Sequence, residues 1–358
     1  MLHRRPSASL LDGAALMLRT IQLAAVLVLC SVQIGSATDA SVKYTGVNIA
    51  GGDFAPQSLP GRYGTDYIYP DHKTIDYFAA KGMNIIRVPA LWERLQHQLG
   101  GDLDSAEMRR LDDVVDYAAS KGMRVILDVH NYAAYRGATI GTESVPANAL
   151  GGLWGRIAQR YKDNDAVIFG LMNEPNNLPT ETWLQAANGA IAEIRKTGAK
   201  NLILVPGVGW SSARSWGGGG YGTPNSEAML KVEDPADNFA YEVHQYFNAD
   251  WTGASPDCQS VDVGVASLSP VTEWAKQHGK RAFLGEVGVG SGSTCLDALD
   301  RVMAYMSENS EVWLGWTYWA GGAWWPKDYF TNLQPLDGKD RPQMGVLKKY
   351  TQADATMR

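Results

Sequence analysis

Short apolar segments rich in β-branched and aromatic residues alternate along the chain with longer stretches whose apolar residues recur at helical spacing. An apolar segment of this kind is typical of a strand that is buried on both faces. Eight segments fit the description: Tyr44–Ile49, Asn84–Val88, Arg124–Val129, Val167–Met172, Asn201–Val205, Phe239–His244, Arg281–Glu286 and Val312–Trp319. Their alternation with helices predicts parallel strands linked by helical crossovers.

The helical stretches support this interpretation through their periodicity and their ends. Within Ser105–Ser120, apolar residues recur every three or four positions, as in a helix that packs one face on a sheet. Ala80-Lys81-Gly82-Met83 and Ser120-Lys121-Gly122-Met123 precede the second and third strands. In each, we expect the glycine to end the helix in a left-handed conformation. A last helix is expected near Met344–Thr351.

Eight strands with intervening helices predict an α/β fold of the (β/α)8 or TIM-barrel type. An open doubly wound sheet would also alternate, but it usually has fewer strands and a glycine-rich first turn. No G-x-G-x-x-G follows the first strand, and no linker rich in proline, serine or threonine divides the chain after residue 37. We therefore expect residues 38–358 to form a single domain.

The first 37 residues have the layout of a secretory signal peptide. Arg4, Arg5 and Arg19 precede the apolar run Ile21–Cys30, and small residues follow as far as Ala37, which predicts cleavage near that residue. The alternative is an uncleaved membrane anchor, but the run is much shorter than the roughly 20 residues that a spanning helix needs. The sequence thus predicts an extracellular or periplasmic protein with no membrane contact after cleavage.

Charge and cysteine content narrow the possible partners. Residues 38–358 carry 29 basic and 37 acidic side chains, a net charge of −8, which favours neither nucleic acid nor an anionic membrane as a partner. Cys258 and Cys295 are the cysteines of this part of the chain, and an even pair in an oxidising compartment predicts one disulfide. Two separate free thiols are the alternative. We expect a monomer.

Polar residues gather where the predicted strands end. In a barrel these carboxyl-terminal strand ends point to one face, and the chemistry is built there. The ends read Arg87-Val88-Pro89, Asp128-Val129-His130-Asn131-Tyr132, Met172-Asn173-Glu174-Pro175, His244-Gln245-Tyr246, Gly285-Glu286 and Tyr318-Trp319. Two glutamates and two histidines from different strands should therefore converge on one rim.

Such a set suits the hydrolysis of a glycosidic bond with retention of configuration. Retaining glycosidases need two carboxyl groups roughly 5–5.5 Å apart, one as nucleophile and one as acid/base. Glu174 and Glu286 lie on the fourth and seventh strands, on opposite sides of a narrow lumen. Arg87 and Tyr246 are candidates to keep Glu286 ionised, and Asn173 is placed to reach a sugar 2-hydroxyl.

These residues resemble glycoside hydrolase family 5. Asn173-Glu174-Pro175 ends the fourth strand and Glu286 ends the seventh, while Asp128-Val129-His130-Asn131-Tyr132 and His244-Gln245-Tyr246-Phe247 are similar to the endo-β-1,4-glucanase branch. The resemblance covers about Tyr44 to Tyr350. It implies that Glu174 is the acid/base, that Glu286 is the nucleophile and that Trp319 stacks under the sugar at the −1 position. It also implies substrate-binding roles for Arg87, His130, Asn131, Asn173, His244 and Tyr246, with no cofactor and no metal.

The chain has 12 tryptophans, and their places along it predict two roles. Trp154, Trp183, Trp274 and Trp313 lie in predicted helices or in the last strand, where we expect them to pack. Aromatic rings stack on the apolar faces of pyranose rings and can line a groove for a neutral polymer. The tryptophans expected to do so lie in loops on the active face: Trp210, Trp216, Trp251, Trp324 and Trp325. Trp92 could serve either role.

The sequence thus predicts a secreted endo-β-1,4-glucanase, a cellulase, with a β-glucan polysaccharide as substrate. An endo-β-1,4-mannanase or another β-glycanase on the same fold is the alternative substrate assignment. A metal-dependent hydrolase could use Asp128, His130, His244 and Glu286 as ligands, but the first strand ends in Asn48-Ile49-Ala50 and adds no histidine. A catalytically silent sugar-binding barrel is the non-enzyme alternative, although binding alone does not require both glutamates.

Overall fold

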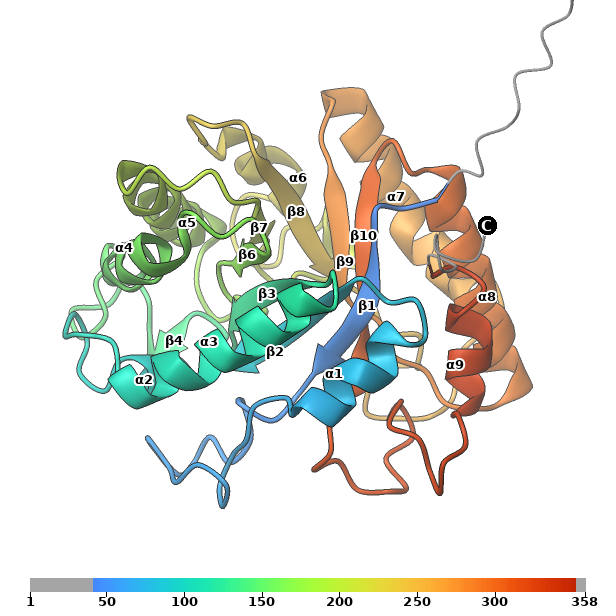
Figure 1. Cartoon of the computed structure of the whole chain (residues 1–358). Helices are drawn as coiled ribbons and strands as arrows, with labels where there is room; N and C mark the ends of the chain where they lie inside the picture. The colour runs from blue at the N-terminus through green and yellow to red at the C-terminus, as the bar shows by residue number, and fades with distance from the viewer. Residues whose placement is uncertain (1–40, 352–358) are drawn as a thin grey trace, which may run out of the picture. The chain divides into compact units, whose positions relative to one another are not determined.

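The computed structural model of the protein describes residues 41–351 (Figure 1). The predicted signal peptide at residues 1–37 lies outside this range. Among the described helices, none combines the length and the apolar character needed to cross a membrane.

Within residues 41–351 the sheet closes into a barrel of parallel strands in the order β1-β10-β9-β8-β7-β6-β3-β2. The strands are β1 (Tyr44–Ile49), β2 (Ile85–Ala90), β3 (Arg124–Val129), β6 (Val167–Gly170), β7 (Ile203–Pro206), β8 (Phe239–His244), β9 (Ala282–Glu286) and β10 (Trp313–Gly321). A short hairpin, β4 (Ala134–Tyr135) and β5 (Ala138–Thr139), follows β3. Every predicted strand is present, so the (β/α)8 prediction is confirmed.

Helices surround the barrel in Figure 1. They are α1 (His72–Ala79), α2 (Trp92–Leu95), α3 (Ser105–Ser120), α4 (Ala149–Tyr161), α5 (Thr180–Lys196), α6 (Asn225–Ala228), α7 (Val263–His278), α8 (Ser293–Glu308) and α9 (Pro342–Leu347), with 3-10 turns at Ala213–Ser215 and Met229–Lys231. The α3 bounds match the prediction, and Asp104 caps its first turn by accepting hydrogen bonds from the Ala106 and Glu107 amides. Gly82 and Gly122 have φ of +77° and +74°, which confirms the left-handed helix ends.

The last helix differs from its prediction at both ends. It begins at Pro342 rather than at Met344 and ends at Leu347 rather than at Thr351. Proline has no amide hydrogen to donate and a fixed φ, and both suit the first turn of a helix. Pro342 therefore starts the helix two residues before the apolar periodicity becomes visible.

An apolar layer fills the amino-terminal part of the barrel interior. Seven strands each contribute one buried residue to it: Tyr44, Ile85, Ile126, Ile168, Leu204, Ala240 and Phe283. Side chains on a strand alternate between its two faces, so the inward residues of the next layer lie two positions further along. They include Arg87 after Ile85, Asp128 after Ile126, and Glu242 after Ala240. The polar residues of the barrel thus stand on an apolar floor.

A disulfide joins two connecting regions on one side of the barrel. Cys258, in the segment between β8 and α7, is bonded to Cys295 at the start of α8, with their Cα atoms 5.3 Å apart. The predicted disulfide is confirmed. It anchors the segment that follows β8 to the helix that follows β9.

Loss of this disulfide should lower the free energy of unfolding. The bond closes a loop with a sequence separation of 37, for which the entropy of loop closure in the unfolded chain corresponds to about 3–4 kcal/mol. We expect the free energy of unfolding of the Cys258→Ser/Cys295→Ser double variant to be lower by that amount, and its urea midpoint to be lower accordingly. Wild type in excess reductant should approach the double variant, and the double variant should not respond to reductant. Equal midpoints for all samples would contradict the prediction.

Candidate active site

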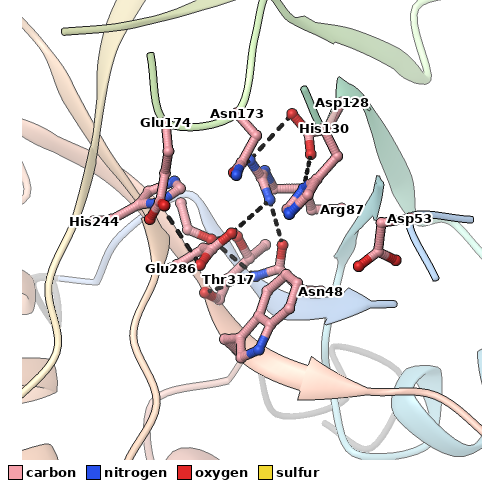
Figure 2. A network of polar contacts seen from close by, with 12 residues as sticks. Asn48, Asp53, Arg87, Asp128, His130, Asn173, Glu174, His244, Glu286 and Thr317 are labelled. Carbon is pink, nitrogen blue, oxygen red and sulfur yellow. Dashed lines mark hydrogen bonds and ion pairs between the residues drawn. The ribbon is translucent and has the colours of Figure 1, made fainter. Parts of the chain in front are cut away.

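Arg87 lies at the centre of the polar layer inside the barrel. It points inward from β2, directly above the apolar floor, and its side chain is fully buried. Its Nη1 donates to Asn48 Oδ1 at 2.9 Å and to Glu286 Oε1 at 3.1 Å, and its Nη2 donates to Asn173 Oδ1 at 2.9 Å. Figure 2 shows the guanidinium among these partners.

Two further carboxylates complete the surroundings of Arg87. Asp128 Oδ1 lies 3.1 Å from Nη2 and Glu242 Oε1 lies 3.1 Å from Nε; both are ion-pair contacts whose angles fall short of hydrogen-bond geometry. Burial alone would lower the pKa of the guanidinium, but the charges of Asp128, Glu242 and Glu286 outweigh it and raise the pKa. Arg87 is therefore a permanent buried cation.

Glu286 ends β9 and is almost fully buried, with 4% of its surface exposed. Tyr246 donates its hydroxyl to Glu286 Oε2 at 2.6 Å, while Arg87 holds the other oxygen. His244 Nδ1 lies 3.7 Å from Oε2. Burial raises the pKa of the Glu286 carboxyl and Glu174 adds to that effect, while His244 and Arg87 oppose it. The arrangement offers a desolvated carboxylate that accepts one hydrogen bond on each oxygen, from Arg87 and Tyr246, with His244 as a third group within ion-pair distance.

Glu174 approaches Glu286 from the far side of the barrel, four residues after the end of β6. Its Oε1 lies 2.8 Å from His244 Nδ1, and one oxygen of Glu174 and one of Glu286 lie within 4.8 Å of each other. The backbone of Glu174 has φ of +44°, a conformation that is costly for a residue with a side chain and is concentrated at functional sites. Figure 2 shows the two glutamates and His244 facing one another.

His244 connects the two glutamates to the polar layer below them. Its Nδ1 faces Glu174, and its Nε2 lies 3.1 Å from Glu242 Oε1. Burial would lower the pKa of His244, but the negative charges of Glu286, Glu174 and Glu242 outweigh it and raise the pKa to about 10. The imidazole is therefore protonated and positive at neutral pH.

His130 and Asn173 lie on the other side of Arg87. His130 Nδ1 is 2.7 Å from Asp128 Oδ2, and its ring stacks on Trp319 with centroids 5.6 Å apart. Burial opposes the charged form of His130, but the hydrogen bond to Asp128 prevails and raises the pKa. Asn173 is buried and turns its amide oxygen toward Arg87. Both side chains therefore have fixed orientations beside the glutamates.

A cleft of about 710 Å³ runs from Glu174 and Tyr246 along the loops that follow β7 and β8. Its lining includes Trp210, Tyr221 and Trp251, and Trp210 is 50% exposed. Trp319 is directed toward a second aromatic group, Trp325 and Tyr329, whose rings stack with centroids 4.2 Å apart. Trp324 is exposed.

The structure does not bring Asn131 to this group of side chains. Its Oδ1 accepts from the Trp92 amide at 2.6 Å, and its Nδ2 donates to Glu93 Oε2 at 2.8 Å. Successive side chains along a strand point to opposite faces. Because His130 points into the barrel, Asn131 faces away from it. Its amide instead fixes the short helix α2 to the end of β3.

Trp216 and Trp92 are also buried. Trp216 was expected to contact sugar, but it is 1% exposed and packs edge-on against Trp274 and Tyr241. That expectation is wrong because the loop after β7 folds back over α7. Trp92 is fully buried as well. Trp154, Trp183, Trp274 and Trp313 pack in the core as predicted.

Asn48 and Glu242 are members of the polar layer that the strand-end pattern did not predict. Asn48 donates to the Gly285 carbonyl at 2.9 Å and accepts from Arg87. Glu242 is fully buried between Arg87 and His244. The available signal was the two-residue spacing on a strand, since Glu242 precedes His244 by two positions and a charged residue within an apolar strand requires a partner.

Glu174, His244 and Glu286 each offer one atom within 4.8 Å of the others, a spacing that could admit a metal ion. One feature opposes that role: Glu286 already lies against the buried Arg87 guanidinium, whose positive charge would repel a cation there. The residues fit a metal-free acid–base site better.

Comparisons with known proteins agree with this site. Residues 38–322 match the family model described as cellulase, glycosyl hydrolase family 5. An Aspergillus niger protein named endo-β-1,4-glucanase B is 36% identical over 83% of this chain and 86% of its own length. A Xanthomonas axonopodis pv. citri endo-β-1,4-glucanase is 46% identical, with a TM-score of 0.85 over 87% of this chain and all of that chain.

A third relative, XacCel5A, has a structure in complex with cellopentaose. It is 48% identical, with a TM-score of 0.85 over 86% of this chain and 99% of that chain. The match to the family model spans most of the described barrel, and the resemblance drawn from the strand ends is confirmed. The chain belongs to glycosyl hydrolase family 5 and is a glycoside hydrolase.

Proposed function

We propose that this protein is an endo-β-1,4-glucanase that hydrolyses internal bonds of a β-1,4-glucan with retention of configuration. The observation that carries the proposal is the approach of the Glu174 and Glu286 carboxylate oxygens to within 4.8 Å. Retaining glycosidases place their carboxyl groups about 5–5.5 Å apart, whereas inverting ones need roughly 6.5–9.5 Å to admit a water molecule between acid and base.

In the first step, Glu286 attacks the anomeric carbon while Glu174 gives its proton to the departing glycosidic oxygen. A covalent glycosyl ester on Glu286 forms as the glycosidic bond breaks. In the second step, the Glu174 carboxylate takes a proton from water, and the resulting oxygen nucleophile displaces Glu286 from the anomeric carbon. The second step restores both glutamates, since Glu174 is again protonated and Glu286 is again a free carboxylate.

The surroundings of the two glutamates support this division of roles. Glu286 receives a hydrogen bond from Arg87 and one from Tyr246, so a nucleophilic carboxylate is favoured there. Glu174 is more exposed and lies on a loop beside the cleft, where a proton can pass to a leaving group and where water can enter. Arg87 orients the Asn173 amide through its oxygen, which leaves the amide nitrogen to donate to a sugar 2-hydroxyl.

The cleft supports a long neutral chain as the substrate. Trp210 and Trp251 line it on one side of the glutamates, and Trp319 lies with His130 beside them. We assign Trp319 to the sugar at the −1 position and Trp210 to a sugar on the leaving-group side, with His130, His244 and Tyr246 as polar contacts. Relatives that are named endo-β-1,4-glucanases favour glucan over the mannan alternative.

The biological setting belongs to the same proposal. We propose that residues 1–37 are a secretory signal peptide and that residues 38–358 form the single catalytic domain, which works outside the cytoplasm. The Cys258–Cys295 disulfide supports an oxidising compartment. One chain carries the residues of the site, so a monomer suffices for the reaction.

Replacement of the nucleophile should abolish hydrolysis without abolishing sugar binding. We expect Glu286→Gln to reduce reducing-end release from carboxymethyl-cellulose by about a thousandfold or more, because an amide cannot form the glycosyl ester. Cellopentaose binding, measured by calorimetry, should persist. Wild type should act on soluble β-1,4-glucan in preference to mannan or xylan. Substantial activity in the variant, or a wild-type preference for mannan, would overturn the assignment.

The stereochemical outcome tests the carboxylate separation independently of any variant. Proton NMR of wild-type enzyme with a cellooligosaccharide should show the β-anomer as the first product, with the α-anomer appearing later by mutarotation. Initial appearance of the α-anomer would show inversion and would remove Glu286 from the nucleophile role.

The hydroxyl of Tyr246 should control the acid limb of the pH profile. Tyr246→Phe removes a donor that favours the ionised form of Glu286, so the pKa of Glu286 should rise further. Activity is lost as pH falls through that pKa, and the acid limb of kcat/KM should therefore move to higher pH. A hydrogen bond to a charged group is worth about 1.5–3 kcal/mol, which corresponds to a loss of roughly 10- to 100-fold in kcat/KM.

The matched control is Tyr241→Phe. Tyr241 is buried on β8, five residues before Tyr246, and its hydroxyl donates to the Met229 carbonyl outside the barrel. That variant should lose some stability and keep the wild-type pH profile. If both variants showed the same unshifted acid limb, the proposed role of the Tyr246 hydroxyl would fail.

A further inference from the structure

Glu242 takes no direct part in the reaction described above, yet it is fully buried in the middle of the polar layer. It lies on β8, two residues before His244 and on the same side of the strand. One oxygen, Oε1, is 3.1 Å from His244 Nε2 and 3.1 Å from Arg87 Nε. A buried carboxylate is costly unless it is paired, so its contacts with His244 and Arg87 need an explanation.

We propose that Glu242 is a positioning residue that keeps both ring nitrogens of His244 protonated, so that the acid proton of Glu174 is delivered to the substrate and not to the imidazole. This proposal rests on the acid/base role proposed for Glu174. Glu242 itself does not touch the reacting atoms, because it lies below His244 on the side away from the cleft.

The hydrogen-bond geometry is the first argument. An ionised carboxylate can only accept hydrogen bonds, so His244 Nε2 must carry a proton toward Glu242. His244 Nδ1 lies 2.8 Å from Glu174 Oε1 and 3.7 Å from Glu286 Oε2. When Glu174 is ionised, Nδ1 must donate as well. The ring is then an imidazolium that has a donor at each end and no lone pair to accept a proton.

The charges facing His244 are the second argument. Glu242 lies on its own strand, Glu174 follows β6, Glu286 ends β9, and Arg87 from β2 lies behind Glu242. Burial disfavours the imidazolium, but these carboxylates prevail and raise the pKa of His244 to about 10. Among these carboxylates, Glu242 is the one whose charge stays the same throughout the proposed reaction.

The packing around Glu242 is the third argument. A Cβ atom on Gly285 would lie 2.2 Å from Glu242 Oε1, so the residue before the nucleophile must lack a side chain for Glu242 to occupy its place. Glu242 Oε2 is buried and has no hydrogen-bond partner. An oxygen left in that state lowers stability, which is a cost more consistent with a role in function than with a purely structural one.

The consequence for the reaction concerns where the acid proton can go. A neutral imidazole with a bare Nδ1 would accept the Glu174 proton across 2.8 Å and compete with the glycosidic oxygen for it. An imidazolium cannot accept it. After Glu174 has given its proton to the leaving group, the same imidazolium stabilises the resulting carboxylate through Nδ1.

The test is direct observation of the His244 ring by ¹⁵N NMR of the full-length protein labelled in histidine, with His244→Gln to assign the signal. In the wild type, both nitrogens should be protonated from about pH 5 to pH 8. In Glu242→Gln, one negative charge is lost from beside the ring, so the His244 pKa should fall by about one unit or more.

The activity of Glu242→Gln should change in a matching way. We expect kcat to fall at least about tenfold only above the lowered His244 pKa, where the ring becomes neutral, so that the alkaline limb of kcat moves to lower pH together with the ring titration. At more acidic pH, kcat and KM should each change by less than about twofold. Glu107→Gln is the matched control, since Glu107 is a buried carboxylate on α3 that accepts from Tyr67 and Tyr69 outside the barrel. That variant should keep the wild-type His244 signals and pH profile.

Several outcomes would overturn the proposal. One is a wild-type His244 with an unprotonated nitrogen at neutral pH, which needs no variant to detect. Another is a Glu242→Gln variant that is less stable but retains the wild-type His244 signals and alkaline limb. If that variant does not fold, Gly285→Ala takes its place, because the added methyl group displaces the Glu242 carboxylate sterically. The His244 pKa should fall in that variant too. The ¹⁵N signals of the His244 ring do not depend on turnover. If the enzyme proved to invert configuration, the proposed retaining mechanism would be refuted, while the protonation of His244 could still be measured.

Discussion

One buried positive charge organises the inside of the barrel. Arg87 stands on a floor of apolar side chains contributed by seven strands, where water cannot compensate its charge. A guanidinium there requires acceptors on every side, and the structure supplies Asn48, Asp128, Asn173, Glu242 and Glu286 from five different strands or strand ends. Since each acceptor must point at one group, the relative positions of the strand ends are fixed together. The geometry at Glu174 and Glu286 is thus set by a cation that takes no part in the proposed reaction.

The same cation makes the two glutamates chemically unequal. Glu286 lies within its reach and also receives the Tyr246 hydroxyl, so its charge is met by donors on both oxygens. Glu174 lies farther from Arg87, on a loop residue with positive φ, and its carboxylate contacts His244. The Glu286 carboxylate therefore lies inside the barrel, and the Glu174 carboxylate reaches it from a loop at the rim. Two residues of one type acquire different roles from the elements that carry them and not from their own chemistry.

Much of this could be predicted from the chain because the signals are local. Apolar strands alternating with helices indicate the barrel, and the polar residues at strand ends indicate one face. What failed depended on orientation or on distant packing. Asn131 follows His130 directly and so points the opposite way, and Trp216 is covered by a loop whose path no local pattern reveals. Glu242 lies one layer below the strand ends, so the pattern of polar strand ends does not include it. Asn48 lies at the end of the first strand, and its sequence position gives no sign that its amide accepts from Arg87 and donates to the Gly285 carbonyl.

The polar layer also links stability to catalysis at the level of single atoms. Buried ion networks are often less stable than apolar packing of the same volume, and this one leaves Glu242 Oε2 without a partner. The apolar floor must therefore supply the stability that the layer above it gives up. Gly285 shows how tight the coupling is, since its missing side chain is the space in which Glu242 lies. A larger side chain at Gly285 would displace Glu242 and would also disturb Glu286, the next residue in the chain. Because Gly285 and Arg87 both meet Glu242 at one oxygen, Oε1, a substitution in the polar layer disturbs more contacts than one in the apolar floor beneath it.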